Sequence, residues 1–295
     1  MVSHADKRNQ LILNVILMLV SILTVAPLVI LIMSSLSSEK ALAQYGYTFF
    51  PKVFSLEAYK YIFTQGATIA RAYLITVGVT LVGTCVSLLL TAMLAYPLSR
   101  KDFAKRQIVT FAIFFTMLFN GGMVPSYMMW TNIFHIKNTL LAYLLPSLLI
   151  NAFNVILMKN FFSTNIPPAI IEAAQIDSAG EFKIFFSVVM PLSLPILATL
   201  GLLTAVAYWN DWINGLYYIN NDMLDSIQVI LNRMLQDAQF LFSGSNTATS
   251  VDLNNMPSIS VRMAIAVLGM IPILVVYPFF QKYFVKGMTI GAVKG

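Results

Sequence analysis

The chain has 295 residues, of which 58% are hydrophobic and only 10% are charged. A soluble domain has about 45–50% apolar and about 25% charged residues, and disordered chains are poor in apolar residues, so both classes are excluded. The formal charge of +6 could point to a nucleic-acid partner, but in a membrane protein a basic excess more often marks the cytoplasmic loops. The composition therefore indicates a protein embedded in a membrane.

Six stretches of the chain contain no Asp, Glu, Lys, Arg or His and have about the 17–25 residues that cross a bilayer. They cover residues 11–33, 72–96, 108–130, 140–158, 184–208 and 263–281. No linker divides them, so the sequence predicts one all-α integral membrane domain over residues 11–281. Segments 1–10 and 282–295 remain as short termini on the same side of the membrane.

The loops between these spans differ in charge. Eleven Lys and Arg and five Asp and Glu lie on the side of the termini, whereas seven cations and seven acids lie on the other. Because Lys and Arg in short loops concentrate in the cytoplasm, we predict that both termini are cytoplasmic. The outer segments, residues 34–71 and 209–262, are longer; a short amphipathic helix is predicted from Asp225 to Phe240 and an irregular polar loop over residues 242–250.

The cytoplasmic stretch 163–183 is long for a connection between two spans, and its sequence predicts structure. Asn165 can cap a helix whose first turn accepts the two prolines that follow, and the Ala-rich sequence carries this helix to about Asp177. A turn at residues 178–180 then leads into a second helix that begins at Glu181. We expect this helix–turn–helix to project from the membrane and to enter a groove on a partner.

The same stretch resembles the EAA loop of binding-protein-dependent ABC importer permeases. The family pattern is Glu-Ala-Ala, three residues, Gly, nine residues, Ile, one residue and Leu-Pro. Here Glu172, Ala173 and Ala174 match, and the spacing is kept through Val188, Met190 and Pro191. Ser178 stands where the family has Gly, a departure that Gly180, two positions on, could compensate.

Three further stretches resemble the carbohydrate-uptake branch of these permeases, specifically the second permease of maltose-type and polysaccharide-type importers. They are residues 119–125 (FNGGMVP), 209–212 (WNDW) and the C-terminus 283–295. The resemblance covers nearly the whole chain and implies a type I importer fold with six transmembrane helices and a cytoplasmic coupling-helix loop. It also implies a bacterial cytoplasmic membrane, a second permease, two ATPase subunits and an extracytoplasmic solute-binding protein.

The resemblance further implies that the coupling loop seats in a cleft on the ATPase, where Glu172 would bind a basic residue by a charge-assisted hydrogen bond. The small residues of the C-terminal tail would form a second ATPase contact. The expected coupling residues are Glu172, Ala173, Ala174, Asp177, Ser178, Gly180, Lys286, Gly287 and Gly291.

The chain contains no Gly-Lys dipeptide, so a phosphate-binding P-loop is impossible and ATP and Mg²⁺ must be bound by another subunit. With one Cys and two His, a metal site built on these residues is not expected either. We therefore predict a transport subunit that is not itself an enzyme and binds no cofactor.

Carbohydrate sites combine polar side chains, which bind hydroxyls, with aromatic faces, which stack on sugar rings. Candidates within the spans or at their ends are Asn120, Asn151, Asn154, Tyr208, Trp209, Asn210 and Trp212. For the Tyr and Trp residues an interfacial aromatic belt is favoured over sugar contact, whereas for the two Asn of the fourth span helix packing and the lining of a cavity are equally favoured. Neutral and anionic oligosaccharides both remain open as substrates.

Two rival functions are less consistent with these features. An ion-coupled secondary transporter would place ionisable residues within the membrane, whereas all six predicted spans lack them. A membrane enzyme would gather acids, His or Cys near one face, whereas the acids here are scattered apart from Glu172, Asp177 and Glu181 in the predicted coupling loop.

Overall fold

The computed structural model describes residues 4–64, 66–242 and 259–292, and side chains within residues 9–64, 66–236 and 259–278. Apart from one isolated bridge between Ser37 and Phe54, these residues form helices and their connections. The chain divides into two compact units, residues 1–69 with 231–272 and residues 70–230 with 273–295, and each is described by itself. The predicted polar loop at 242–250 lies, after its first residue, outside the described residues.

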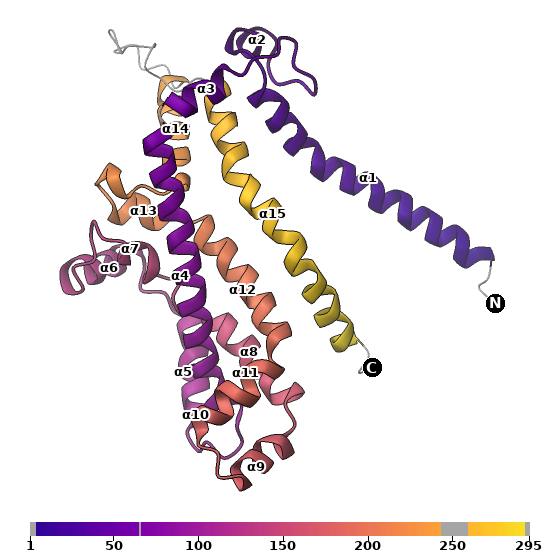
Figure 1. Cartoon of the computed structure of the whole chain (residues 1–295), viewed down its shortest axis with the longest axis vertical. Coiled ribbons are helices and arrows are strands. Elements are labelled where there is room, and N and C mark those ends of the chain that lie inside the picture. The colour runs from indigo at the N-terminus through magenta and orange to yellow at the C-terminus, as the bar shows by residue number, and fades with distance from the viewer. Residues whose placement is uncertain (1–3, 65, 243–258, 293–295) are drawn as a thin grey trace. The chain divides into compact units, whose positions relative to one another are not determined.

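The elements follow in chain order (Figure 1). They are α1 His4–Ser35, α2 Glu39–Tyr45, α3 Glu57–Thr64, α4 Gly66–Ser99, α5 Arg106–Leu118, α6 Met123–Met128, η1 Met129–Ile133, α7 Leu141–Leu144, α8 Ala152–Asn165, α9 Pro168–Ile176, α10 Glu181–Ile184, η2 Phe185–Val189, α11 Met190–Leu192, α12 Leu194–Trp209, α13 Ile213–Tyr218, η3 Asp222–Leu224, α14 Ile227–Phe242 and α15 Ile259–Ala292. The amphipathic helix predicted near residues 225–240 is present as α14.

Three described helices are long and apolar enough to cross a membrane, and the number is up to five if each of two bent pairs counts as one span. The long helices are the apolar parts of α1, α4 and α15, which include three of the predicted spans. The other three expected spans are not continuous helices. Span 108–130 bends by 114° between α5 and α6, span 184–208 bends by 81° between α11 and α12, and span 140–158 is divided between α7 and α8.

Each break coincides with residues that disfavour a regular helix. Gly122, at the start of α6, has φ +88°, a conformation that residues with a Cβ rarely adopt. Pro146 lies between α7 and α8, and Pro195 follows the break at Ser193 directly. Proline removes a backbone donor and clashes with the preceding turn, so the apolar composition that suggested a continuous span does not ensure one.

In the first unit, polar side chains outside the predicted spans hold the helix ends. Ser38 caps α2, and its hydroxyl accepts a hydrogen bond from the Ala41 amide at 3.3 Å. The Glu39 carboxylate accepts hydrogen bonds from the amides of Ile259 and Ser260, at 2.9 and 3.0 Å, at the first turn of α15. A carboxylate there satisfies amides that lack a helical partner and complements the helix dipole.

The second unit has an apolar core where α4, α8 and the α10–α12 segment meet. Its buried residues include Ala92 and Ala95 of α4, Met158 of α8, and Ile184 and Val189 of the α10–α11 segment. Ala174 and Ala179, before and after the turn that follows α9, pack against this core. Figure 1 shows α9 at one extremity of the unit, away from α6, α7 and α13. The coupling-loop sequence is therefore anchored on its inner side and presented on its outer side.

Helix α9 begins two residues later than expected. Asn165 is the last residue of α8, where its side-chain amide donates to the carbonyl of Phe161 at 3.1 Å, so the prediction that it caps α9 is wrong. Pro167 occupies the N-cap position and Pro168 the first helical position, where a missing N–H costs nothing. The paired prolines themselves fix the start of α9.

The C-terminus of α9 forms a Schellman turn. The Ser178 amide donates to the Gln175 carbonyl at 2.9 Å, and the Ala179 amide donates to the Ala174 carbonyl at 3.0 Å. Ser178 is the left-handed residue of this turn, with φ +58°, whereas Gly180 has an ordinary φ of −68°. The suggestion that Gly180 compensates for the missing family glycine is therefore wrong, because Ser178 itself adopts the conformation for which glycine is suited.

Substitution of glycine in α4 tests the packing of the second unit. A Cβ on Gly83 would lie 2.6 Å from the ring of buried Tyr208, whereas a Cβ on Gly78 would meet nothing within 4 Å. We predict that Gly83→Ala destabilises the protein by about 1–3 kcal/mol, the usual cost of overpacking, and that Gly78→Ala costs nothing. Thermal unfolding of the two purified variants measures the difference, and equal stabilities would contradict this packing.

Substitution of Ser178 tests the turn. Because the left-handed conformation costs a residue with a Cβ about 1–2 kcal/mol and glycine loses more chain entropy on folding, we predict that Ser178→Gly raises stability by up to about 1 kcal/mol. Ser178→Ala keeps the strained Cβ and is the matched control. Thermal unfolding of both variants decides the matter; a Ser178→Gly protein less stable than the Ala variant would count against the turn.

Candidate coupling site

The expected coupling residues occupy different sides of α9. Glu172 and Ala173 are exposed, and Ala174 is half-buried against the core. Asp177 is the exposed C-cap, with its amide donating to the Ala173 carbonyl at 3.0 Å. The Glu172 side chain makes no hydrogen bond or ion pair with the described residues, so its carboxylate is free to bind another subunit.

The outer side of this segment also carries apolar side chains. Ile176, the last residue of α9, is 83% exposed, and Phe182, in α10, is 72% exposed. Both lie beyond the uncharged spans, and Ile170 of α9 is 40% exposed as well. Large apolar side chains exposed beside an unpaired carboxylate are typical of a surface that another protein covers.

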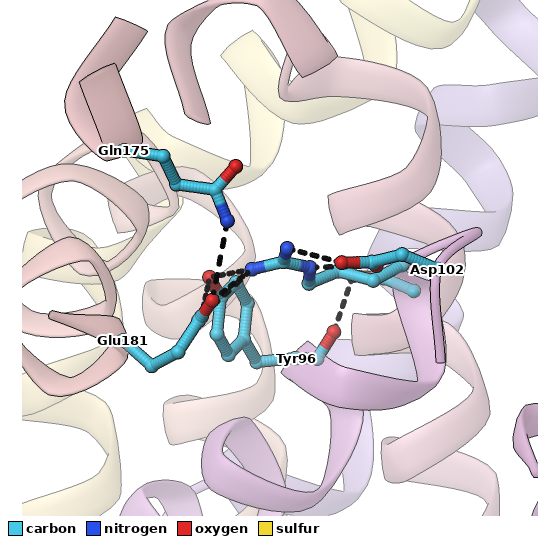
Figure 2. Close-up of polar contacts among 6 residues, drawn as sticks. Tyr96, Asp102, Gln175 and Glu181 are labelled. Atoms are coloured by element: carbon cyan, nitrogen blue, oxygen red, sulfur yellow. Dashed lines mark hydrogen bonds and ion pairs between the residues drawn. The ribbon is translucent and has the colours of Figure 1, made fainter. Parts of the chain in front are cut away.

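A polar network connects the segment after α9 to the C-terminal end of α4 (Figure 2). Nη1 of Arg100 donates to both carboxylate oxygens of Glu181 at 2.7 Å and to the Tyr96 hydroxyl at 3.1 Å. The Tyr96 hydroxyl in turn donates to Glu181 Oε2 at 2.9 Å. From α9, the Gln175 side-chain amide donates to Glu181 Oε1 at 3.3 Å, so Glu181 receives hydrogen bonds from two other helical segments.

Asp102 binds the remaining side of the same guanidinium. Nε of Arg100 donates to Asp102 Oδ1 at 2.9 Å, and Nη2 donates to Oδ2. These hydrogen bonds lower the pKa of the Asp102 carboxyl and raise that of Arg100, which keeps the pair ionised. Local sequence patterns do not indicate this network, because Arg100 and Glu181 are far apart in the chain. The local feature that could have indicated the network is the pair Arg100 and Asp102, which follows the uncharged span 72–96.

A cleft of about 430 Å³ separates α9 from the connection between α4 and α5. It is lined, among others, by Lys101 and Arg106 on one side and by Ile171 and Glu172 on the other. Packing between the two segments is therefore incomplete at this point, and the network around Arg100 bridges them.

The C-terminal coupling candidates are described less completely. Lys286, Gly287 and Gly291 lie in α15, which continues as a helix to Ala292, but their side chains fall outside the described residues. Their expected contact with an ATPase stays a prediction.

Three of the four Asn candidates for the substrate path make hydrogen bonds within the fold. Asn120 lies in the break after α5, where its side-chain oxygen accepts from the Gly122 amide at 2.9 Å. Asn151 is the N-cap of α8 and accepts from the Asn154 amide at 3.2 Å. The side-chain amide of Asn154 approaches the Thr204 hydroxyl of α12 at 3.4 Å, a contact between packed helices.

The aromatic candidates at the end of α12 divide into buried and accessible residues. Tyr208 is 2% exposed and Trp209 is 6% exposed, within the packing of the second unit. Trp212 is 37% exposed, and exposed Asn210 accepts at 3.4 Å from the side chain of Gln228. Asn210 and Trp212 are therefore the two candidates of this group with a surface that a ligand could contact.

Tyr208 binds the backbone of the connection between α7 and α8. Its hydroxyl donates to the carbonyl of Leu144 at 2.9 Å, and the side-chain amide of Asn214 donates to the carbonyl of Pro146 at 3.1 Å. Asn214 is itself held by the Asp211 carboxylate at 2.8 Å, and burial raises the pKa of Asp211. Sequence reasoning missed Asn214, because its acceptor is a carbonyl exposed only by the break between α7 and α8.

Comparison with known proteins places these features in a family. Residues 87–290 match the family described as binding-protein-dependent transport system inner membrane component. The polygalacturonan/rhamnogalacturonan transport system permease protein YtcP of Bacillus subtilis is 38% identical over 95% of this chain and 96% of its own length. Protein LplC of the same organism is 38% identical, with 94% of this chain and 91% of that protein covered.

A solved structure agrees with these sequence matches. The crystal structure of a bacterial ABC transporter involved in the import of the acidic polysaccharide alginate contains a chain with a TM-score of 0.80 and 29% identity. The match covers 96% of this chain and 99% of that one. The chain therefore belongs to the family of binding-protein-dependent transport system inner membrane components.

Proposed function

We propose that this chain is a permease subunit of an ATP-driven ABC importer for oligosaccharides, in the bacterial cytoplasmic membrane with both termini in the cytoplasm. Its family and its likeness over nearly the full length to sugar-transport permeases support this function. The proposed complex contains a second permease, two ATPase subunits that bind ATP and Mg²⁺, and an extracytoplasmic solute-binding protein. Six spans, two of them bent and one divided, form this chain's half of the translocation path.

In this proposal, α9 and the turn after it form the coupling segment that docks on an ATPase. The observation that carries it is that one segment, at one extremity of the second unit (Figure 1), exposes Ile176, Phe182 and Glu172, whose carboxylate has no partner among the described residues. A basic ATPase residue would bind the Glu172 carboxylate, and an apolar cleft would cover the two large side chains. Positive charge in the adjacent α4–α5 connection supports a cytoplasmic position for this segment.

We propose that the substrate is an oligosaccharide with carboxylate groups. Two proteins that resemble this chain over nearly their full lengths carry names that refer to polygalacturonan/rhamnogalacturonan and to the acidic polysaccharide alginate. The melibiose/raffinose/stachyose import permease protein MelC of Bacillus subtilis is 28% identical over 78% of this chain. A neutral oligosaccharide is therefore the alternative substrate.

Gly180 allows a direct test of docking. Its Cβ would meet nothing within 4 Å and its backbone is ordinary, so a larger side chain disturbs only a partner that covers it. We predict that Gly180→Leu releases the ATPase subunits from the purified complex and lowers uptake by about tenfold or more. Gly180→Ala is the matched control and is expected to do neither, because Ala is as poor an N-cap as Leu but adds only one methyl group. Co-purification and uptake are the measurements. Normal uptake by both Gly180→Leu and Glu172→Ala would refute docking through this segment.

Uptake competition tests the substrate class. Proteoliposomes that contain the complex and its binding protein are expected to take up labelled oligogalacturonate, and unlabelled oligouronates are expected to compete. Raffinose at the same concentration is the neutral control and is expected to leave uptake unchanged. Competition by raffinose but not by the oligouronates would favour the neutral alternative.

A further inference from the structure

Glu181 connects three segments that are separate in the sequence. It begins α10, it receives a hydrogen bond from Gln175 of α9, and it binds Arg100 and Tyr96 at the end of α4 (Figure 2). The Tyr96 ring also packs against Phe185, in the segment that follows Glu181, with ring centroids 5.5 Å apart. A displacement of Glu181 therefore acts on α4 through both a polar and an apolar contact.

The chain that leads from α10 to α12 connects these two helices less directly than the contacts of Glu181 connect α10 to α4. The segment Glu181–Leu192 is bent by 81° relative to Leu194–Trp209, so no continuous helix carries a displacement of α9 into α12. The cleft between α9 and the α4–α5 connection likewise leaves these two segments without close packing. The contacts of Arg100 join Glu181 to the end of α4 beside this cleft, in addition to the apolar core that α4 shares with the α10–α11 segment.

The geometry of Arg100 distinguishes it from an ordinary surface cation. Only 14% of its side chain is exposed, although the carboxylates of Asp102 and Glu181 are in more accessible residues, 64% and 56% exposed. All three guanidinium nitrogens donate, with Asp102 bound by two of them and Glu181 by the third. Exposed ion pairs contribute little, but a largely buried guanidinium in a fixed fork geometry holds its partners in one arrangement.

We propose that Arg100 is a positioning residue for transport, which latches Glu181, and with it the coupling segment, to the C-terminal end of α4. When an ATPase displaces α9, the latch transmits this displacement to the long α4 helix and so to the translocation path. Asp102 orients the guanidinium from the opposite side. This inference rests on the proposed docking of α9, but it concerns the step after docking.

The test measures coupling and docking separately in the complete complex, reconstituted in proteoliposomes with its binding protein and labelled oligogalacturonate. We expect Arg100→Met and Glu181→Gln each to lower uptake per ATP hydrolysed by about tenfold, while the ATPase subunits still co-purify. The double variant should lose no more than either single variant, because both remove the same contact. Arg100→Lys should restore part of the loss, since a point charge replaces only part of the fork.

Lys105→Met is the matched control, because it removes a nearby exposed cation that has no part in the network, and it should behave like the wild type. Normal coupling in both single variants, additive losses in the double variant, or loss of the ATPase subunits from Arg100→Met and Glu181→Gln would each overturn the latch. If Arg100→Met does not accumulate, Tyr96→Phe, which removes one hydroxyl, replaces it and is expected to lower the same ratio. A wild-type complex that lacks coupled uptake would contradict the proposed function instead.

Discussion

A backbone in the apolar part of a membrane must satisfy its own hydrogen bonds, and this constraint explains much of the second unit. Where a span is interrupted, carbonyls lose their helical partners and water does not replace them. Between α7 and α8 the protein supplies side chains instead: Tyr208 donates to Leu144 and Asn214 donates to Pro146. The cost is steric, because Tyr208 occupies a position that leaves no room for a side chain at Gly83.

The same constraint assigns roles to polar residues that otherwise suggest a substrate site. Carbohydrate recognition and backbone satisfaction both use Asn amides and Tyr hydroxyls, so residue type alone does not distinguish them. Tyr208, Asn151 and Asn154 are engaged within the fold. Asn210 and Trp212 retain exposed surface, so a substrate path in this unit has these two side chains available to it.

The candidate coupling segment, α9 and the turn after it, combines a fixed inner side with an exposed outer side. Its inner residues, Ala174 and Ala179, are fixed by the Schellman turn and the apolar core, and Glu181 is held by the network around Arg100. Its exposed residues include Ile176, Phe182 and Glu172, and the Glu172 carboxylate, which borders the cleft toward the α4–α5 connection, has no partner in the part of the chain that the structure describes. Such a division suits a segment that transmits movement. A displacement applied at its exposed side reaches the neighbouring helices only if its inner side stays attached to them.

The sequence by itself determined the class of protein, the three long spans, the helix–turn–helix of residues 163–183 and the start of α10 at Glu181. These features depend on composition and on local rules, such as apolar length, proline at a helix start and the spacing of the EAA pattern. Only the tertiary structure decided where the other spans break, which residue of the turn adopts the left-handed conformation, and that Arg100 meets Glu181. Hydropathy measures the apolar content of a span and not its continuity, and a contact between the ends of distant helices depends on how the intervening chain packs.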